Sequence, residues 1–412
     1  MPRLIRFGLV VFGLAVFGPF LFAPSLHAEA PPFQLSGFAT IGMVATGQSD
    51  LRFIRPSINH PGAENPDFGP DTIVGIQGNM ALGQRASVVV QITSREDPLG
   101  SYEPRASLAF LSYSPTPYFT VRAGRLRVPF FMHSDTVDIN YAHPWVRPPT
   151  EVYSLNPFQD LDGIDFLFRG DFGNTNIEVH PYFGDSVLAI YQGGNSHLSN
   201  TRGLNVTAAT DRLTLFAGYV ESDFAIKWSG ADFLALGAGL HQLDPILPGY
   251  ADSILAQISG NKGFSTFSAV GAQWDDGIWL LIGEYVRLNS RLYTHDAHAW
   301  EVTAARRFGN WTPYLTLARH TEDKPSVAPN QTGVPMLDAA IDAFTSARNL
   351  SQRSITVGTR WDFHRNAALK LEFNHARISG KGWGNFFARD PFNANMRDRS
   401  INTVGVSVDV TF

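Results

Sequence analysis

The final segment of this chain alternates between apolar and polar or small side chains without interruption. It reads TVGVSVDVTF from Thr403 to Phe412, so the valines and Phe412 fall on one side of an extended chain. A repeat of two residues fits a β-strand, whose successive side chains point to opposite faces, and does not fit a helix. The same alternation recurs at 84–94, 311–320 and 366–379. The sequence therefore predicts an all-β fold.

The polar side of these segments carries charges that a dry protein core would not accept. In 366–379, Lys370 and Glu372 lie on the face opposite to leucine and phenylalanine side chains. A buried charge costs several kcal/mol, whereas a charge that faces a water-filled lumen costs little. Strands that are apolar outside and polar inside are typical of transmembrane β-barrels. A soluble β-sandwich is the alternative, but a final strand that ends on Phe412 resembles the C-terminal signature of outer-membrane barrels and favours the barrel.

Composition agrees with a barrel and excludes several other classes of protein. No apolar run after residue 30 has the roughly 20 residues that a membrane helix needs. The chain has no cysteine, which excludes disulfides, thiolate metal sites and a thiol nucleophile. The formal net charge of −5 is small and mixed, so no nucleic-acid partner is expected.

The N-terminal residues have the pattern of a secretory signal. Arg3 and Arg6 precede an apolar stretch, and the small-residue run Ala28-Glu29-Ala30 follows it. An N-terminal membrane anchor is the alternative, but the apolar run is shorter than the roughly 20 residues that span a bilayer, and glycines and Pro19 interrupt it. We expect residues 1–30 to be a signal peptide, cleaved after Ala28 or Ala30, and residues 31–412 to form one outer-membrane barrel domain.

Sixteen segments with strand character can be placed along residues 31–412. They lie near 33–46, 71–82, 84–94, 104–114, 117–128, 162–171, 174–183, 203–210, 212–222, 262–274, 277–290, 297–308, 311–320, 351–363, 366–379 and 400–412. Short and long connections alternate between them, as expected for short periplasmic turns and long extracellular loops. An additional strand pair within 231–258 would make eighteen strands, which is the alternative count. In the connection 321–350 we expect a short helix over 336–348.

Aromatic residues are frequent at the predicted periplasmic ends of the strands. An interfacial girdle of such residues is typical of membrane barrels. The residues concerned are Phe33, Tyr118, Phe119, Phe172, Trp274, Phe308, Trp311, Trp361, Phe363 and Phe412.

The third long connection, 129–161, has the most distinctive composition. The strand before it ends RAGRLRVP at 122–129, and the connection contains YAHPW at 141–145 and RPP at 147–149. These motifs resemble the phosphate-selective (O/P-type) and related porin-like families of proteobacteria. The resemblance implies a sixteen-stranded, trimeric porin whose third loop folds into the lumen as a constriction. This chain departs from the phosphate-selective members because its lysines are few and scattered, so phosphate specificity is not expected.

The physics of a wide barrel gives the third connection a role independently of the resemblance. A sixteen-stranded barrel leaves a broad aqueous channel, and selectivity then requires an inserted segment that carries charges at close quarters. Opposed acids and bases across a narrow gap would produce a transverse field. The candidate residues are Arg122, Arg125, Arg127, Asp135, Asp138, Arg147, Glu151 and Asp165. The structural alternative is that these charges pair with each other and fix the loop to the wall.

Arg125 and Arg127 are the preferred selectivity residues on the sequence alone. They precede Pro129, where the strand must end, so their guanidiniums are expected where the loop departs inward. Arginine also suits a bidentate contact with an anion.

These observations predict a porin in the bacterial outer membrane, a passive diffusion channel for small hydrophilic solutes or ions with a lean towards anions. The expected partners are outer-membrane lipid, lipopolysaccharide and, by resemblance, two further copies in a homotrimer. No catalytic residue, cofactor or metal site is expected, and a surface pair such as His295 and His298 is more often solvated than ligating. The alternatives are a plugged or adhesive barrel that presents its loops, and a barrel hydrolase, for which the sequence has no Gly-x-Ser-x-Gly motif.

Overall fold

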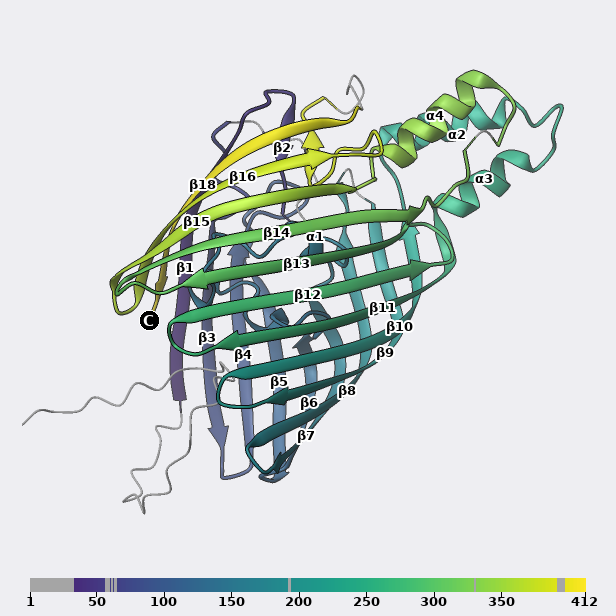
Figure 1. Ribbon diagram of the computed structural model, residues 1–412. Coiled ribbons are helices and arrows are strands. Elements are labelled where there is room, and N and C mark those ends of the chain that lie inside the picture. The colour runs from purple at the N-terminus through teal and green to yellow at the C-terminus, as the bar shows by residue number, and fades with distance from the viewer. Residues whose placement is uncertain are drawn as a thin grey trace, which may run out of the picture.

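The computed structural model describes residues 33–55, 60, 62, 65–191, 194–329, 331–390 and 397–412. The expected signal peptide, residues 1–30, lies outside the described residues. Sixteen antiparallel strands form a closed barrel in which each strand pairs with its neighbours in sequence, and the last strand closes against the first (Figure 1). The all-β fold and the count of sixteen strands are confirmed.

The barrel strands are long, and two short strands pair outside the barrel wall. The barrel consists of β1 (Phe33–Thr46), β3 (Ile73–Leu82), β4 (Ala86–Arg95), β5 (Arg105–Thr116), β6 (Phe119–Arg127), β7 (Asp160–Phe172), β8 (Thr175–Ala189), β9 (Asn195–Ala209), β10 (Leu213–Lys227), β11 (Gly260–Asp275), β12 (Trp279–Ser290), β13 (Asp296–Arg306), β14 (Trp311–Lys324), β15 (Gln352–His364), β16 (Ala367–Ile378) and β18 (Arg399–Thr411). The remaining pair, β2 (Leu51–Phe53) and β17 (Phe386–Ala388), joins the first long connection to the last.

The predicted alternation is visible in the burial of the strands. In β14, Tyr314 and Thr316 are buried inside the barrel, while Leu315 and Leu317 are 44% and 40% exposed on the outside. Residues of β18 follow the same rule, with Asp409 buried inside and the valines outside. A closed barrel leaves no strand edge with unpaired backbone groups, which is the condition for a β-sheet to lie in lipid. With its outward apolar face, this barrel is an outer-membrane structure.

One end of the barrel, which we call the turn end, has short connections such as 173–174 and 276–278. Exposed aromatic residues gather there as predicted, including Tyr118, Phe172 and Phe308, and the rings of Trp311 and Trp361 stack with their centroids 5.3 Å apart. The other end, the loop end, carries most of the long connections.

Two predictions about the loop end were wrong. The segments expected at 174–183 and 203–210 leave a long connection over 184–202, but the connection observed is only 190–194, because β8 and β9 continue past a register shift between Gly184 and Ser186. A bulge of this kind interrupts the two-residue period and hides the strand in the sequence. The segment 231–258 contains helices α2 (Ala231–His241) and α3 (Tyr250–Ile258) rather than a strand pair, so the alternative of eighteen strands is wrong.

The three helices beyond the barrel form a small cluster of their own. Helix α4 (Pro335–Ser346) confirms the helix expected over 336–348. Leu240, Ile254 and Ile341 are among the buried side chains through which α2, α3 and α4 pack. Figure 1 shows these helices together beyond the loop end, far from the C-terminus. No helix among the described residues is long and apolar enough to cross a membrane.

The third long connection, 128–159, lies inside the barrel, as predicted. It contains the short 3-10 helices η1 (Ser134–Thr136) and η2 (Asn140–Ala142) and the single helical turn α1 (Thr150–Tyr153). In Figure 1, α1 lies within the outline of the barrel wall. We call this segment the constriction loop.

Candidate pore constriction

The constriction loop is fixed to the inner wall on the far side of the barrel from where it starts. It leaves β6, yet the backbone N–H of Met132 donates to Glu284 of β12 at 2.9 Å, and the Tyr153 hydroxyl donates to the same carboxylate at 3.0 Å. The indole N–H of Trp145 donates to Thr303 of β13 at 3.0 Å. The loop therefore crosses the lumen and divides its cross-section.

The middle of the constriction loop is held by a buried lysine. Lys370 of β16 has no exposed surface, and its ammonium donates to the backbone carbonyls of Asn140 and Trp145 at 2.6 and 2.7 Å. The same ammonium lies 2.8 Å from Asp409 of β18. The sequence placed Lys370 correctly on the inner face, but the expectation that it faces water was wrong, because the loop covers it.

Arg147 joins the constriction loop to both sides of the barrel closure. Its guanidinium donates from Nε to Asp71 at 2.7 Å and from Nη1 to Glu372 of β16 at 2.9 Å, and it lies over the ring of Phe53 at 4.6 Å. Burial opposes the charge of Arg147, but the two carboxylates more than offset burial and raise its pKa. Arg147 is almost fully buried, which favours a structural role in holding the loop.

Asp138 of the constriction loop accepts hydrogen bonds from two wall arginines. Arg127 Nη2 and Arg95 Nη1 each lie 2.9 Å from a different Asp138 oxygen, and Arg55 donates to the adjacent Val137 carbonyl at 3.3 Å. Burial alone would raise the pKa of Asp138, but the charges of Arg127, Arg95 and Arg55 hold it well below its usual range. The guanidiniums therefore stabilise the ionised form of Asp138.

Among the described residues, the group around Asp138 and Arg147 contains more guanidiniums than carboxylates, and the neighbouring Lys370 and Asp409 add one charge of each sign. Its four guanidiniums (Arg55, Arg95, Arg127 and Arg147) face three carboxylates (Asp71, Asp138 and Glu372). Nε and Nη1 of Arg127 are buried and have no hydrogen-bond partner among the residues that the structure describes. The constriction loop thus meets β4 and β6 at a cluster of guanidiniums.

A second acid–base group lies on the wall closer to the turn end. Arg122 of β6 forms three hydrogen bonds with Asp165 of β7, two from Nε at 2.9 and 3.2 Å and one from Nη2, and His180 Nε2 lies 2.9 Å from the same carboxylate. Asp135, which is exposed on the constriction loop, is near enough for its charge to act on Arg122. Three of the predicted residues, Arg122, Asp165 and Asp135, therefore belong to one electrostatic group.

Glu151 is buried under the loop rather than presented to solution. Its carboxylate accepts a hydrogen bond from Gln352 Nε2 at 2.7 Å, and its backbone carbonyl lies 3.0 Å from His320 Nδ1. Burial raises the pKa of Glu151. The structural alternative describes this residue better than a direct role in selectivity.

The expected place of Arg125 was wrong. Its guanidinium pairs with Asp162 at 2.7 Å on the same face of the sheet as the outward Ile164. Arg127, two residues later, turns inward because the strand ends there and the loop begins. Two arginines that look equivalent in the sequence thus lie on opposite faces of the wall.

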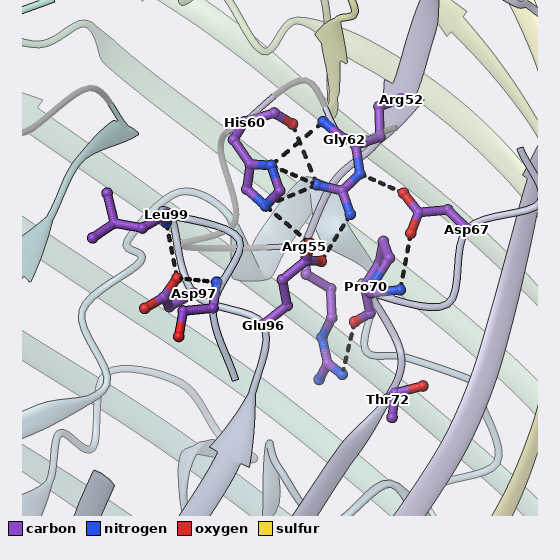
Figure 2. Close-up of polar contacts among 12 residues, drawn as sticks. Arg52, Arg55, His60, Gly62, Asp67, Pro70, Thr72, Glu96, Asp97 and Leu99 are labelled. Carbon is purple, nitrogen blue, oxygen red and sulfur yellow. Dashed lines mark hydrogen bonds and ion pairs between the residues drawn. The ribbon is translucent and has the colours of Figure 1, made fainter. Parts of the chain in front are cut away.

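The sequence missed a further group of charges near the loop end, shown in Figure 2. Arg52 contacts Asp67, donates from Nη2 to Glu96 at 2.7 Å, and approaches His60 at 2.9 Å. His60 in turn lies 3.0 Å from Glu96. These residues come from connections without a two-residue period, so no local signal could have assigned them to the lumen.

The loop end also encloses an apolar cavity of about 300 Å3. Aromatic side chains from several connections line it, among them Trp228, Tyr293, Phe344, Trp383 and Phe387. Beneath it, Phe130 and Phe131 of the constriction loop pack against Phe267 of β11. The side of the lumen between the constriction loop and β8 to β13 thus contains a hydrophobic core.

Comparisons with solved structures agree with this architecture. The anion-selective porin from Comamonas acidovorans aligns with a TM-score of 0.55 at 12% identity, over 92% of this chain and 99% of that one. The fold is a porin fold. The outer membrane channel DcaP of Acinetobacter baumannii gives 0.54 at 14% identity, over 92% and 97% of the two chains.

OmpF of Salmonella typhi gives a TM-score of 0.53 at 12% identity, over 92% of this chain and 97% of that one. No protein-family model matches the sequence, and no curated protein is similar enough to be detected as a relative. At these identities the likeness concerns the fold, and the chemistry of the lumen has to be argued from this chain's own residues.

Proposed function

We propose that this protein is a passive diffusion channel of the bacterial outer membrane for small hydrophilic solutes or ions. The observation that carries the proposal is the constriction loop, which crosses a sixteen-stranded barrel and brings Asp135 and Asp138 towards wall arginines. A loop of this kind narrows a channel that would otherwise pass solutes with little discrimination.

The channel is proposed to prefer anions. The support is the number of guanidiniums around Asp138, which exceeds the number of carboxylates among the described residues, and the two buried nitrogens of Arg127 that have no partner among those residues. A fixed positive excess raises the local concentration of anions in a confined aqueous path. The preference is expected to be modest, because most of these arginines are already paired with carboxylates.

The test is a reversal potential in a planar bilayer under a salt gradient. The wild-type protein is expected to favour anions, and Arg127→Gln should shift the potential towards cations. Arg125→Gln is the matched control, since it removes the same charge from the outer face, and it should leave the potential unchanged. A cation preference in the wild type, or an equal shift in both variants, would refute the anion proposal.

The assembly is proposed to be a homotrimer with residues 1–30 removed on export. Both parts rest on the sequence: the trimer on the family resemblance and the cleavage on the signal pattern. Native mass spectrometry of the protein extracted from membranes tests both, because the subunit mass reveals the start of the mature chain. A monomer, or a mass that includes the first 30 residues, would contradict the proposal.

A plugged or adhesive barrel is the second candidate function. It is favoured by the hydrophobic core between the constriction loop and β10 to β13, and by the helices α2, α3 and α4 at the loop end. Folded protein that inserts into bilayers without conducting would support this candidate. Conductance that rises when α2 to α4 are deleted would indicate a channel that these helices narrow.

A further inference from the structure

Three arginines stand side by side on the outer face of the barrel at the loop end. Arg319 of β14 lies directly opposite Arg353 of β15, and Arg353 lies directly opposite Arg377 of β16. All three are exposed on the outward face. We call these residues the arginine row.

No carboxylate neutralises the arginine row within the described part of the chain. Its side chains take part in no hydrogen bond or ion pair with another described residue. The cross-strand neighbours at its two ends are Trp300 and Ser400, and neither carries a charge. Two other outward arginines near the loop end differ, since Arg125 and Arg202 each contact a carboxylate.

Like charges directly opposite each other destabilise a sheet. Side chains at such positions have Cβ atoms about 5 Å apart, so three guanidiniums can meet one anionic group. Guanidiniums bind phosphate through paired N–H donors, which gives both strength and geometric fit. A bound phosphate group would therefore neutralise the repulsion between the three guanidiniums.

The height of the arginine row on the barrel identifies the source of that phosphate. The stacked pair Trp311 and Trp361 marks the aromatic girdle at the turn end, and these residues lie directly opposite each other. Arg319 and Arg353 are each eight residues further along the same two strands (311 to 319, and 361 to 353). At about 3.4 Å per residue and a tilt of about 40°, this distance corresponds to about 20 Å of height.

The apolar band of such barrels is about 25 Å tall. The arginine row therefore lies at the opposite edge of the band from the aromatic girdle, at the level of lipid headgroups. Between the two lie outward apolar side chains that suit acyl chains, namely Leu315, Leu317, Ile355, Val357, Leu371 and Phe373, which are 40% to 55% exposed.

We propose that the arginine row binds a headgroup phosphate of a phosphorylated glycolipid in the outer leaflet, whose acyl chains lie on the apolar wall below. The assignment to the outer leaflet follows from the loop end, because membrane barrels place long loops outside the cell. The site lies on the outer wall, so the proposal is independent of conduction through the lumen.

The experiment is native mass spectrometry of the full-length mature protein in a neutral detergent, titrated with lipid A that carries both phosphates. Each surface arginine contributes about 1 kcal/mol to an anionic headgroup contact, which is a factor of about five. The triple variant Arg319→Gln, Arg353→Gln and Arg377→Gln is therefore expected to bind about a hundredfold more weakly. Lipid A without phosphates should bind the wild type equally weakly.

The control variant is Arg85→Gln, Arg212→Gln and Arg306→Gln, which changes the net charge equally but lies at the turn end. It should bind lipid A as the wild type does. The row variant is expected to fold, because it removes mutual repulsion, and its heat stability in the same detergent checks this.

Undiminished binding by the folded row variant would overturn the proposal, as would equal binding of lipid A with and without phosphates. A row variant that binds lipid normally but changes its oligomeric state would show that the row is a contact between subunits, which also overturns it. Loss of lipid binding with unchanged conductance would support the lipid site.

Discussion

Replacement of Arg147 should release the constriction loop from the wall. Its side chain is 4% exposed and joins two carboxylates, Asp71 and Glu372, of which Asp71 has no exposed surface. Removing one partner of a buried ion pair leaves uncompensated charge and costs about 3–5 kcal/mol. Arg147→Met keeps most of the side-chain volume, so we expect a loss of about 3–5 kcal/mol in the free energy of unfolding.

The assay is urea unfolding of the detergent-solubilised barrel, followed by tryptophan fluorescence, with single-channel conductance measured in parallel. Arg202→Met is the control, because Arg202 is 64% exposed in its contact with Glu221 and such pairs contribute about 1 kcal/mol or less. In Arg147→Met, a loop that is no longer held should also give larger or noisier conductance steps.

A rescue variant separates loss of charge balance from loss of packing. Arg147→Met combined with Asp71→Asn and Glu372→Gln removes Arg147 together with both carboxylates that it contacts, and a neutral group of similar volume is often tolerated. We expect this triple variant to recover most of the stability. If Arg147→Met costs no more than Arg202→Met, or if the triple variant is less stable than the single one, the account of Arg147 as the buried counter-charge is refuted.

Three further predictions concern the loop and the wall. Lys370→Met should leave Asp409 buried without its cation and free the loop near Asn140. The free energy of unfolding should then fall by about 3–5 kcal/mol. The double variant Lys370→Met with Asp409→Asn should recover much of this loss in the same urea assay. Burial lowers the pKa of His133 to about 4, and burial together with the charge of His133 lowers the pKa of His143. The native state thus favours neutral rings, so their contribution to stability is complete above pH ~6.5 and is lost as the pH falls towards 4. His133→Gln should reduce the dependence of the unfolding free energy on pH between these values. Gly163→Ala should weaken the pairing of β7 with β8 by about 1–3 kcal/mol, because its Cβ would meet the Phe183 carbonyl at 2.0 Å, whereas Gly170→Ala in the same strand meets no atom within 4 Å and should be nearly neutral.

The sequence by itself determined the architecture of the wall. The two-residue period of segments such as 311–320 reflects a physical requirement that applies to each strand separately, namely an apolar face towards lipid and a polar face inside. It therefore survives in the local sequence and allows the strands and the aromatic girdle to be predicted. Where a bulge breaks the period, as near Gly184, the prediction of strand ends failed.

Only the tertiary structure decided what the inner charges do. Lys370 and Glu372 could be assigned to the inner face, but their contacts with the constriction loop depend on residues more than 200 positions away in the chain. The opposite orientations of Arg125 and Arg127 depend on where β6 ends. The register that aligns Arg319, Arg353 and Arg377 into one row joins three strands and a long connection, and no single segment encodes it. The two-residue period of a strand determines which face each of its side chains occupies. The residues that each side chain contacts are determined by closure of the barrel, because closure brings distant segments to the same height.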